Sequence, residues 1–190
     1  MKRILSLTLA GAASVALLAG CLHSPDAPTQ SGFLYSYAKL QKVDDYTWRY
    51  VDTERLPIYK KFMVDPVKVT VTEFDGKPIT AEQREKAAAF VREALIKSLS
   101  EKYPIVTDPG VDVGEVRVAI TSAYKKGMQV GFTVEGAIID SYTTVQAAAV
   151  VRSEVGEAYL GSWWDGPSFR LMIEAWAKRV REGIESVDKK

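Results

Sequence analysis

The sequence predicts an α+β domain: a two-layer sandwich in which two amphipathic helices pack on one face of a mostly antiparallel sheet of four to five strands. Two long segments, 81–103 and 167–187, carry apolar residues at the 3.6-residue spacing of a helix with one buried face. Before and between them, short segments alternate apolar and polar residues, as half-buried strands do. This pattern favours the α+β class, and we expect residues 33–190 to form a single domain without internal repeats.

The first twenty residues are expected to be a signal peptide. Lys2 and Arg3 give a positive start, residues 4–19 are mostly apolar, and small residues lead up to Cys21. The apolar run is short for a membrane span, which needs ~20 apolar residues. Cleavage between Gly20 and Cys21 would leave 190 − 20 = 170 residues, enough for one domain with a core.

Cys21 is the only cysteine, and its position predicts a lipid anchor. The leader resembles a bacterial lipoprotein signal, in which the thiol takes a diacylglyceryl group. Two or three acyl chains anchor a protein stably, whereas one binds a membrane only marginally. The alternative is an ordinary secretory signal with a chance cysteine. Leu22, not Asp, follows the cysteine, and for such lipoproteins the resemblance implies transport to the outer membrane.

Residues 21–32 are expected to be a lipidated flexible tether. They are largely polar and contain Pro25, Pro28 and Gly32, which keep a chain extended and unpacked. His23, the only histidine, lies in this tether, so the folded part contains neither histidine nor cysteine.

An aromatic segment follows over 33–58. Within it Tyr46, Trp48 and Tyr50 alternate with other residues, which predicts a short strand with an aromatic face.

A clearer strand is expected within 59–72. Pro66 cannot donate to a strand ladder, so Asp65-Pro66 should mark a break at an edge or a bulge. One side of this strand should be buried through its alternating valines: Val67, Val69 and Val71.

The first helix should begin after Thr80. Thr80 and Gln83 form a capping-box pattern, in which the threonine hydroxyl accepts from a backbone N–H while the glutamine reaches back. The helix should continue to about Tyr103, because Pro104 stops it.

Three strands are expected next, over 116–121, 132–139 and 145–152, the last two joined as an antiparallel hairpin by 140–144. A shorter strand is expected over 157–163. Pro167 should open the last helix, where its missing N–H costs nothing. This helix should bury one apolar stripe: Phe169, Met172, Ile173, Trp176, Val180, Ile184 and Val187.

Four segments carry a resemblance to a known family: Ser31-Gly32-Phe33-Leu34, Arg49-Tyr50-Val51-Asp52, Val64-Asp65-Pro66-Val67 and Val116-Arg117-Val118-Ala119-Ile120-Thr121. Together they resemble a family of bacterial lipoproteins catalogued as domain of unknown function 3313. The resemblance departs at the predicted hairpin, where a Thr-Gly turn is expected and Thr143-Thr144 is found. It implies an envelope location and an α+β fold, and no activity, because the family has none established.

The residue types argue against familiar catalytic and metal sites. Without histidine or cysteine in the domain, a Ser-His-Asp triad, a cysteine nucleophile and an ordinary zinc site are excluded. Glu135 and Asp140 lie five residues apart on one expected strand and should face opposite sides, so we expect solvated surface charges. No catalytic residue, metal ligand or cofactor is therefore predicted, and we expect the protein not to be an enzyme.

Aromatic residues give the candidate binding surface. Trp163 and Trp164 are adjacent, so on a strand at least one should be exposed, and exposed aromatics favour protein or sugar contacts. The alternative is that both pack under the last helix. The full candidate surface is Tyr46, Trp48, Tyr50, Trp163 and Trp164.

The expected function is that of a membrane-anchored envelope lipoprotein, on the outer membrane and facing the periplasm, which binds another envelope component without catalysis. The alternative is a small-ligand or glycan-binding or processing module with an unrecognised site. Without the leader the formal charge is 23 − 24 = −1, so nucleic acid is not an expected partner.

Overall fold

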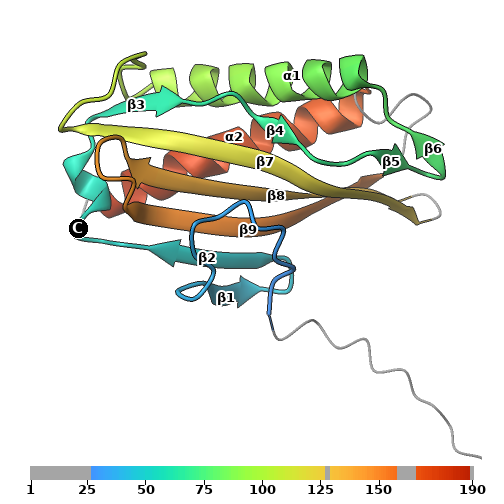
Figure 1. Cartoon of the computed structure of the whole chain (residues 1–190), viewed down its shortest axis with the longest axis horizontal. Helices are drawn as coiled ribbons and strands as arrows, with labels where there is room; N and C mark the ends of the chain where they lie inside the picture. Colours follow the sequence, from blue (N-terminus) through green and yellow to red (C-terminus); the bar gives the residue numbers. More distant parts are fainter. Residues whose placement is uncertain (1–26, 127–128, 158–165, 189–190) are drawn as a thin grey trace, which may run out of the picture.

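Three long antiparallel strands form the centre of the sheet (Figure 1). The computed structural model describes residues 27–126, 129–157 and 166–188. The strand order is β1-β2-β9-β8-β7-β3, and β4 also pairs with β7, which makes seven strands. The predicted α+β sandwich is confirmed, with more strands than the four to five expected. The elements are β1 (Gln41–Asp44), β2 (Thr47–Val51), the short 3-10 helix η1 (Leu56–Ile58), β3 (Lys61–Val64), β4 (Lys68–Val69), β5 (Glu73–Phe74), β6 (Lys77–Pro78), α1 (Ala81–Ser100), β7 (Val113–Lys126), β8 (Gln129–Asp140), β9 (Gln146–Glu157) and α2 (Pro167–Asp188).

The central strands β7, β8 and β9 are each at least twelve residues long, longer than the alternation predicted. Their ends contain glycines and polar residues, which weaken the sequence signal, but pairing with the neighbouring strand extends the ladder there. The predicted hairpin between β8 and β9 is confirmed. The strand expected over 157–163 lies, beyond Glu157, outside the described residues.

The β8–β9 turn places Thr144 at φ +57°, a left-handed conformation that glycine adopts without strain. Asp140 stabilises this turn, because its carboxylate accepts hydrogen bonds from the backbone N–H groups of Tyr142 and Thr143 at 3.0 and 2.8 Å. The position at which a glycine was expected is thus the position that needs one.

The strand expected over 59–72 is divided in two. The short strands β3 and β4 both run parallel to β7, and Asp65-Pro66 interrupts them as predicted. Val67 and Val71 are buried and Val69 is half-buried, while Lys68 and Thr70 between them are exposed.

Both helices cover one face of the sheet and enclose the main core. Thr80 caps α1 with the predicted capping box, in which Thr80 accepts from the Gln83 N–H and Gln83 accepts from the Thr80 N–H. The predicted stripe of α2 is confirmed: Phe169, Ile173, Trp176 and Ile184 are buried, and Met172, Val180 and Val187 pack partly buried beside them.

The other face of the sheet is covered in part by the segment 31–40, drawn in blue in Figure 1. Leu34 of this segment is buried against Ala137 and Ile139 of β8, together with Ala149 and Val151 of β9. A second, smaller core therefore lies on the side opposite the helices, an arrangement that periodicity does not predict.

Candidate binding groove

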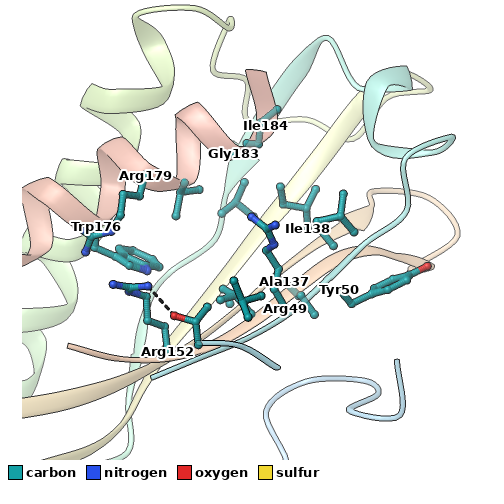
Figure 2. Close-up of a pocket in the computed structure, with 18 of the residues that line it drawn as sticks. Arg49, Tyr50, Ala137, Ile138, Arg152, Trp176, Arg179, Gly183 and Ile184 are labelled. Atoms are coloured by element: carbon teal, nitrogen blue, oxygen red, sulfur yellow. Dashed lines mark hydrogen bonds between the residues drawn. The ribbon is translucent and has the colours of Figure 1, made fainter. Parts of the chain in front are cut away.

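A groove opens where the sheet extends beyond the helices. Helix α2 lies over β8 and β9, and no helix in the described ranges covers β2 and β1 beyond it. Side chains of α2 and β2 therefore face each other across a gap (Figure 2). The gap has a volume of about 220 Å³ and a mainly apolar lining. It is the candidate functional site, and we call it the α2–β2 groove.

Small residues form the floor of the α2–β2 groove. Gly136 of β8, with Ala148 and Val150 of β9, lies on the helix-facing side of the sheet. A Cβ added at Gly136 would meet its nearest neighbour, Val150, at 3.5 Å, which is ordinary van der Waals contact. The glycine is therefore not required by close packing, and its lack of a side chain keeps the floor low.

Helix α2 forms one wall through Trp176, Val180, Gly183 and Ile184. Gly183 is unusual, because a glycine inside a helix costs about 0.5–1 kcal/mol relative to alanine. A Cβ added there would have no atom within 4 Å, so nothing in the described structure demands glycine. The missing side chain widens the groove at its rim.

Charged residues at one end of the groove are paired with each other. Arg152 donates to Glu154 at 2.7 Å and to the Thr47 hydroxyl at 2.6 Å, the latter bond dashed in Figure 2. Arg179 of α2 also donates to Glu154, which is buried.

A second carboxylate, Asp44, lies 3.7 Å from Arg152. Burial acts to raise the pKa of Asp44, but hydrogen bonds from Tyr46 and Thr47 and the charge of Arg152 lower it overall. This network holds β2 and β9 to α2.

Arg49 of β2 differs from these arginines. Figure 2 shows its guanidinium reaching from β2 towards the α2 side of the groove, where Gly183 and Ile184 lie. Within the described ranges the Arg49 side chain has neither a hydrogen bond nor an ion pair, and it is exposed. Among the described residues, the α2–β2 groove thus combines an apolar interior with one cation that no carboxylate neutralises.

The predicted aromatic surface is not one surface. Trp48 and Tyr50 lie half-buried on the face opposite the helices, packed on the small core that contains Leu34. Tyr46 lies in the β1–β2 turn and is 57% exposed. The Tyr50 ring points away from the groove in Figure 2, and its hydroxyl lies 3.4 Å from Asp52. The other predicted site residues, Gly20, Cys21, Trp163 and Trp164, lie outside the described residues.

The expectation that Glu135 is a solvated surface charge is wrong. Its side chain is 1% exposed, on the face opposite the helices, because the segment 31–40 covers it. The carboxylate accepts hydrogen bonds from the Ser31 N–H at 3.2 Å and from the Tyr37 hydroxyl at 2.5 Å. Asp140 lies on the other face of β8, within 3.3 Å of the Tyr59 hydroxyl, so the two carboxylates do not converge.

A third carboxyl group, Glu115 of β7, lies beside Asp65 and Arg117. Burial and a hydrogen bond to Asp65 raise the pKa of Glu115 to about 7, against the opposing charge of Arg117. The Arg117 guanidinium also stacks 5.7 Å from the ring centroid of Phe33 and 4.9 Å from that of Tyr35. This cluster therefore joins the sheet to the segment 31–40.

The groove was missed from the sequence, although one signal was available. Gly183 interrupts an amphipathic helix pattern between Val180 and Ile184, at a position where glycine costs about 1 kcal/mol relative to alanine. In the described part of the chain, no cluster of three or more metal-ligating side chains occurs. Of the helices in these ranges, none combines the length and apolar character that crossing a membrane requires.

Comparison with known proteins gives a family and a set of similar folds. No curated protein sequence is significantly similar to this chain. Among solved structures, the chain is similar to protein XCC0632 from Xanthomonas campestris, at 7% identity over 68% of this chain and 86% of that one, with a TM-score of 0.48. It is similar to a PelC dodecamer from Paraburkholderia phytofirmans at 12% identity over 75% and 95%, with a TM-score of 0.45. It is also similar to a minor lipoprotein from Acinetobacter baumannii at 10% identity over 68% and 94%, with a TM-score of 0.37.

The family match rests on sequence and spans the segment 31–40, both short parallel strands, α1, β7 and the start of β8. It covers residues 29–132, more than half of the 190 residues. The resemblance stated from the sequence is confirmed: the chain belongs to the family described as "Protein of unknown function (DUF3313)".

Proposed function

We propose that this protein is a lipoprotein of the bacterial envelope whose folded domain holds another envelope component in the α2–β2 groove. The leader and Cys21 support the anchor, since a positive start, an apolar run and small residues before a cysteine are what lipoprotein processing requires. The further details, an outer-membrane site with the domain in the periplasm and acyl chains on Cys21, belong to the same proposal.

The observation that carries the binding role is the open apolar lining of the groove. Ligands usually bind in concave, mainly apolar pockets that carry a few polar groups. The chain retains this lining and adds a helix-interior glycine, Gly183, at a cost in stability of about 0.5–1 kcal/mol. An occupant that contacts α2 closely accounts for both features.

The groove favours binding over catalysis. Asp44 in the lining and the buried Glu154 next to it both lie beside Arg152, and Glu154 also accepts from Arg179. A general acid or base needs a carboxyl group aimed at the substrate, and these are held by arginines instead. The lining is mainly aliphatic, Tyr50 points away and Trp176 is only 2% exposed, so stacking on sugar rings is not favoured either.

Photo-crosslinking in living cells tests this proposal. A photoreactive amino acid is placed at Val43, which is 53% exposed on the rim of the groove, and in a control at Val111, which is 81% exposed in a loop outside the groove lining. We expect one specific adduct, of protein or lipid, from Val43 and none from Val111. The same products from both positions would contradict a binding role for the groove.

A further inference from the structure

We propose that the occupant of the α2–β2 groove is the acyl chain of an anionic amphiphile, with its carboxylate or phosphate on Arg49. This inference rests on the proposed binding function and names the chemistry of the ligand. It follows from three properties of the groove as the described residues form it: an interior without free polar groups, one cation without an ion-pair partner at the opening, and two glycines that leave room.

The interior offers no partners to a peptide backbone. In the strands beneath the groove, the backbone N–H and C=O groups are already hydrogen-bonded to neighbouring strands, since β9 pairs with β2 on one side and with β8 on the other. Helix α2 satisfies its own backbone. A peptide laid in the groove would bury its backbone polar groups without hydrogen bonds, a cost that an acyl chain does not have.

Arg49 sets the charge of the ligand. A guanidinium presents five donors in a planar fork that matches a carboxylate or a phosphate. Arg152 and Arg179 are already bound to Glu154, whereas Arg49 has no ion-pair partner in the described part of the chain. An anionic headgroup is therefore attracted to this end of the groove, and a cationic one is repelled.

The two glycines, Gly136 and Gly183, leave room in the groove for an acyl chain. Gly136 lowers the floor and Gly183 opens the α2 wall, and neither is required by packing within the protein. A Cβ added at Gly183, which lies on the rim of the groove, would have no protein atom within 4 Å. Gly183→Leu should consequently obstruct the groove and still fold, because leucine is also the better helix former.

The test uses isolated membranes that hold the full-length protein, without the cofactors that would convert free fatty acids. A long-chain carboxylic acid with a photoreactive diazirine in its chain is compared with the alcohol and the amine of the same length. We expect the acid to label the protein most strongly and the modified peptides to include α2 residues around Val180 and β2 residues around Arg49.

Matched variants distinguish the contribution of the headgroup to binding from that of the acyl chain. Arg49→Gln should lower labelling by the acid about tenfold and leave labelling by the alcohol unchanged, whereas Lys102→Gln, an exposed cation outside the groove lining, should change neither. Gly183→Leu should abolish labelling of the groove by every probe. Ala175→Leu, which adds the same side chain at an exposed position of α2 outside the groove lining, should not.

Equal labelling by acid, alcohol and amine would overturn the proposal, as would labelling that survives Gly183→Leu. If such a result accompanies capture of a single protein from Val43, the acyl-chain inference fails and the binding function stands. If Val43 captures nothing specific as well, both fail.

Discussion

The hydroxyl of Tyr37 donates a 2.5 Å hydrogen bond to the carboxylate of Glu135, ninety-eight residues further along the chain. Tyr37 lies in the segment 31–40 and Glu135 in the middle of β8, so this bond fixes the start of the folded chain to the centre of the sheet. The Tyr37 hydroxyl also accepts from the Gly32 and Leu34 N–H groups at 3.0 and 3.3 Å. The Tyr37 hydroxyl therefore connects the backbone of the segment 31–40 to the sheet.

Tyr37→Phe should therefore destabilise the protein. Removal of the hydroxyl leaves the buried Glu135 carboxylate with one donor fewer and leaves two N–H groups without their acceptor, a loss of about 1–3 kcal/mol. Denaturant unfolding measures it. Tyr35→Phe is the matched control, because Tyr35 is 59% exposed, and it should change the free energy of unfolding by less than about 0.5 kcal/mol. Equal effects of the two variants would contradict the role given to Tyr37.

Because the pKa of Glu115 is raised in the folded protein, we expect the free energy of unfolding to depend on pH. Its pKa is raised to about 7 in the folded protein from an ordinary value of 4.5, so the folded state binds more protons than the unfolded state between these values. The contribution to stability is fully present below about pH 4.5 and is lost as the pH rises through 7. Glu115→Gln should flatten this decline, as measured by the free energy of unfolding at pH 5.5 and pH 8. An unchanged pH dependence in the variant would show that the proton is not held at this cluster.

Thr144→Gly should stabilise the protein. A β-branched residue at φ +57° carries a strain of about 1–2 kcal/mol, part of which is offset by the greater freedom of glycine in the unfolded chain. The expected gain in the free energy of unfolding is about 0.5–1 kcal/mol. Thr143→Gly, one residue earlier and without a positive φ, should instead be destabilising. A loss of stability in Thr144→Gly would mean that this turn adopts another conformation.

Cys21→Ser tests the anchor. Without the thiol no diacylglyceryl group can be attached, so the protein should be released from the membrane fraction or should accumulate as an uncleaved precursor. Membrane fractionation with mass determination of the product distinguishes these results from the unmodified behaviour. Normal processing with unchanged membrane association would refute lipidation at Cys21.

The fold was largely predictable because its helices and central strands bury one face each. The α2 stripe, the Thr80 capping box and the Asp65-Pro66 break are local patterns, and the structure confirms them. Strand β1 was not predicted, since Gln41–Asp44 is exposed at every residue and owes its conformation to pairing with β2. Its register, like the ends of the long strands, depends on a neighbour that sequence alone does not name.

The candidate site was not predictable in the same way. Glu135 is buried by the segment 31–40, about a hundred residues earlier in the chain, and the residue pattern of β8 alone does not indicate this contact. The α2–β2 groove results from the strand order, which places β2 beside β9 at the edge of the sheet that α1 and α2 do not cover. The binding surface was predicted from aromatic residues, which included Trp48 and Tyr50. Both pack on the face of the sheet opposite the helices, whereas Arg49 between them faces the groove.

Occupancy of the groove in the native membrane is the most direct test of the account. A thiol introduced by Gly183→Cys lies on the groove rim, and one introduced by Ala175→Cys lies at an exposed position of the same helix. In intact envelopes we expect a bulky maleimide to modify the Ala175→Cys protein fully and the Gly183→Cys protein slowly, with full reaction of both after detergent extraction. Equally fast modification of both thiols in the membrane would show an empty groove and contradict the proposed function.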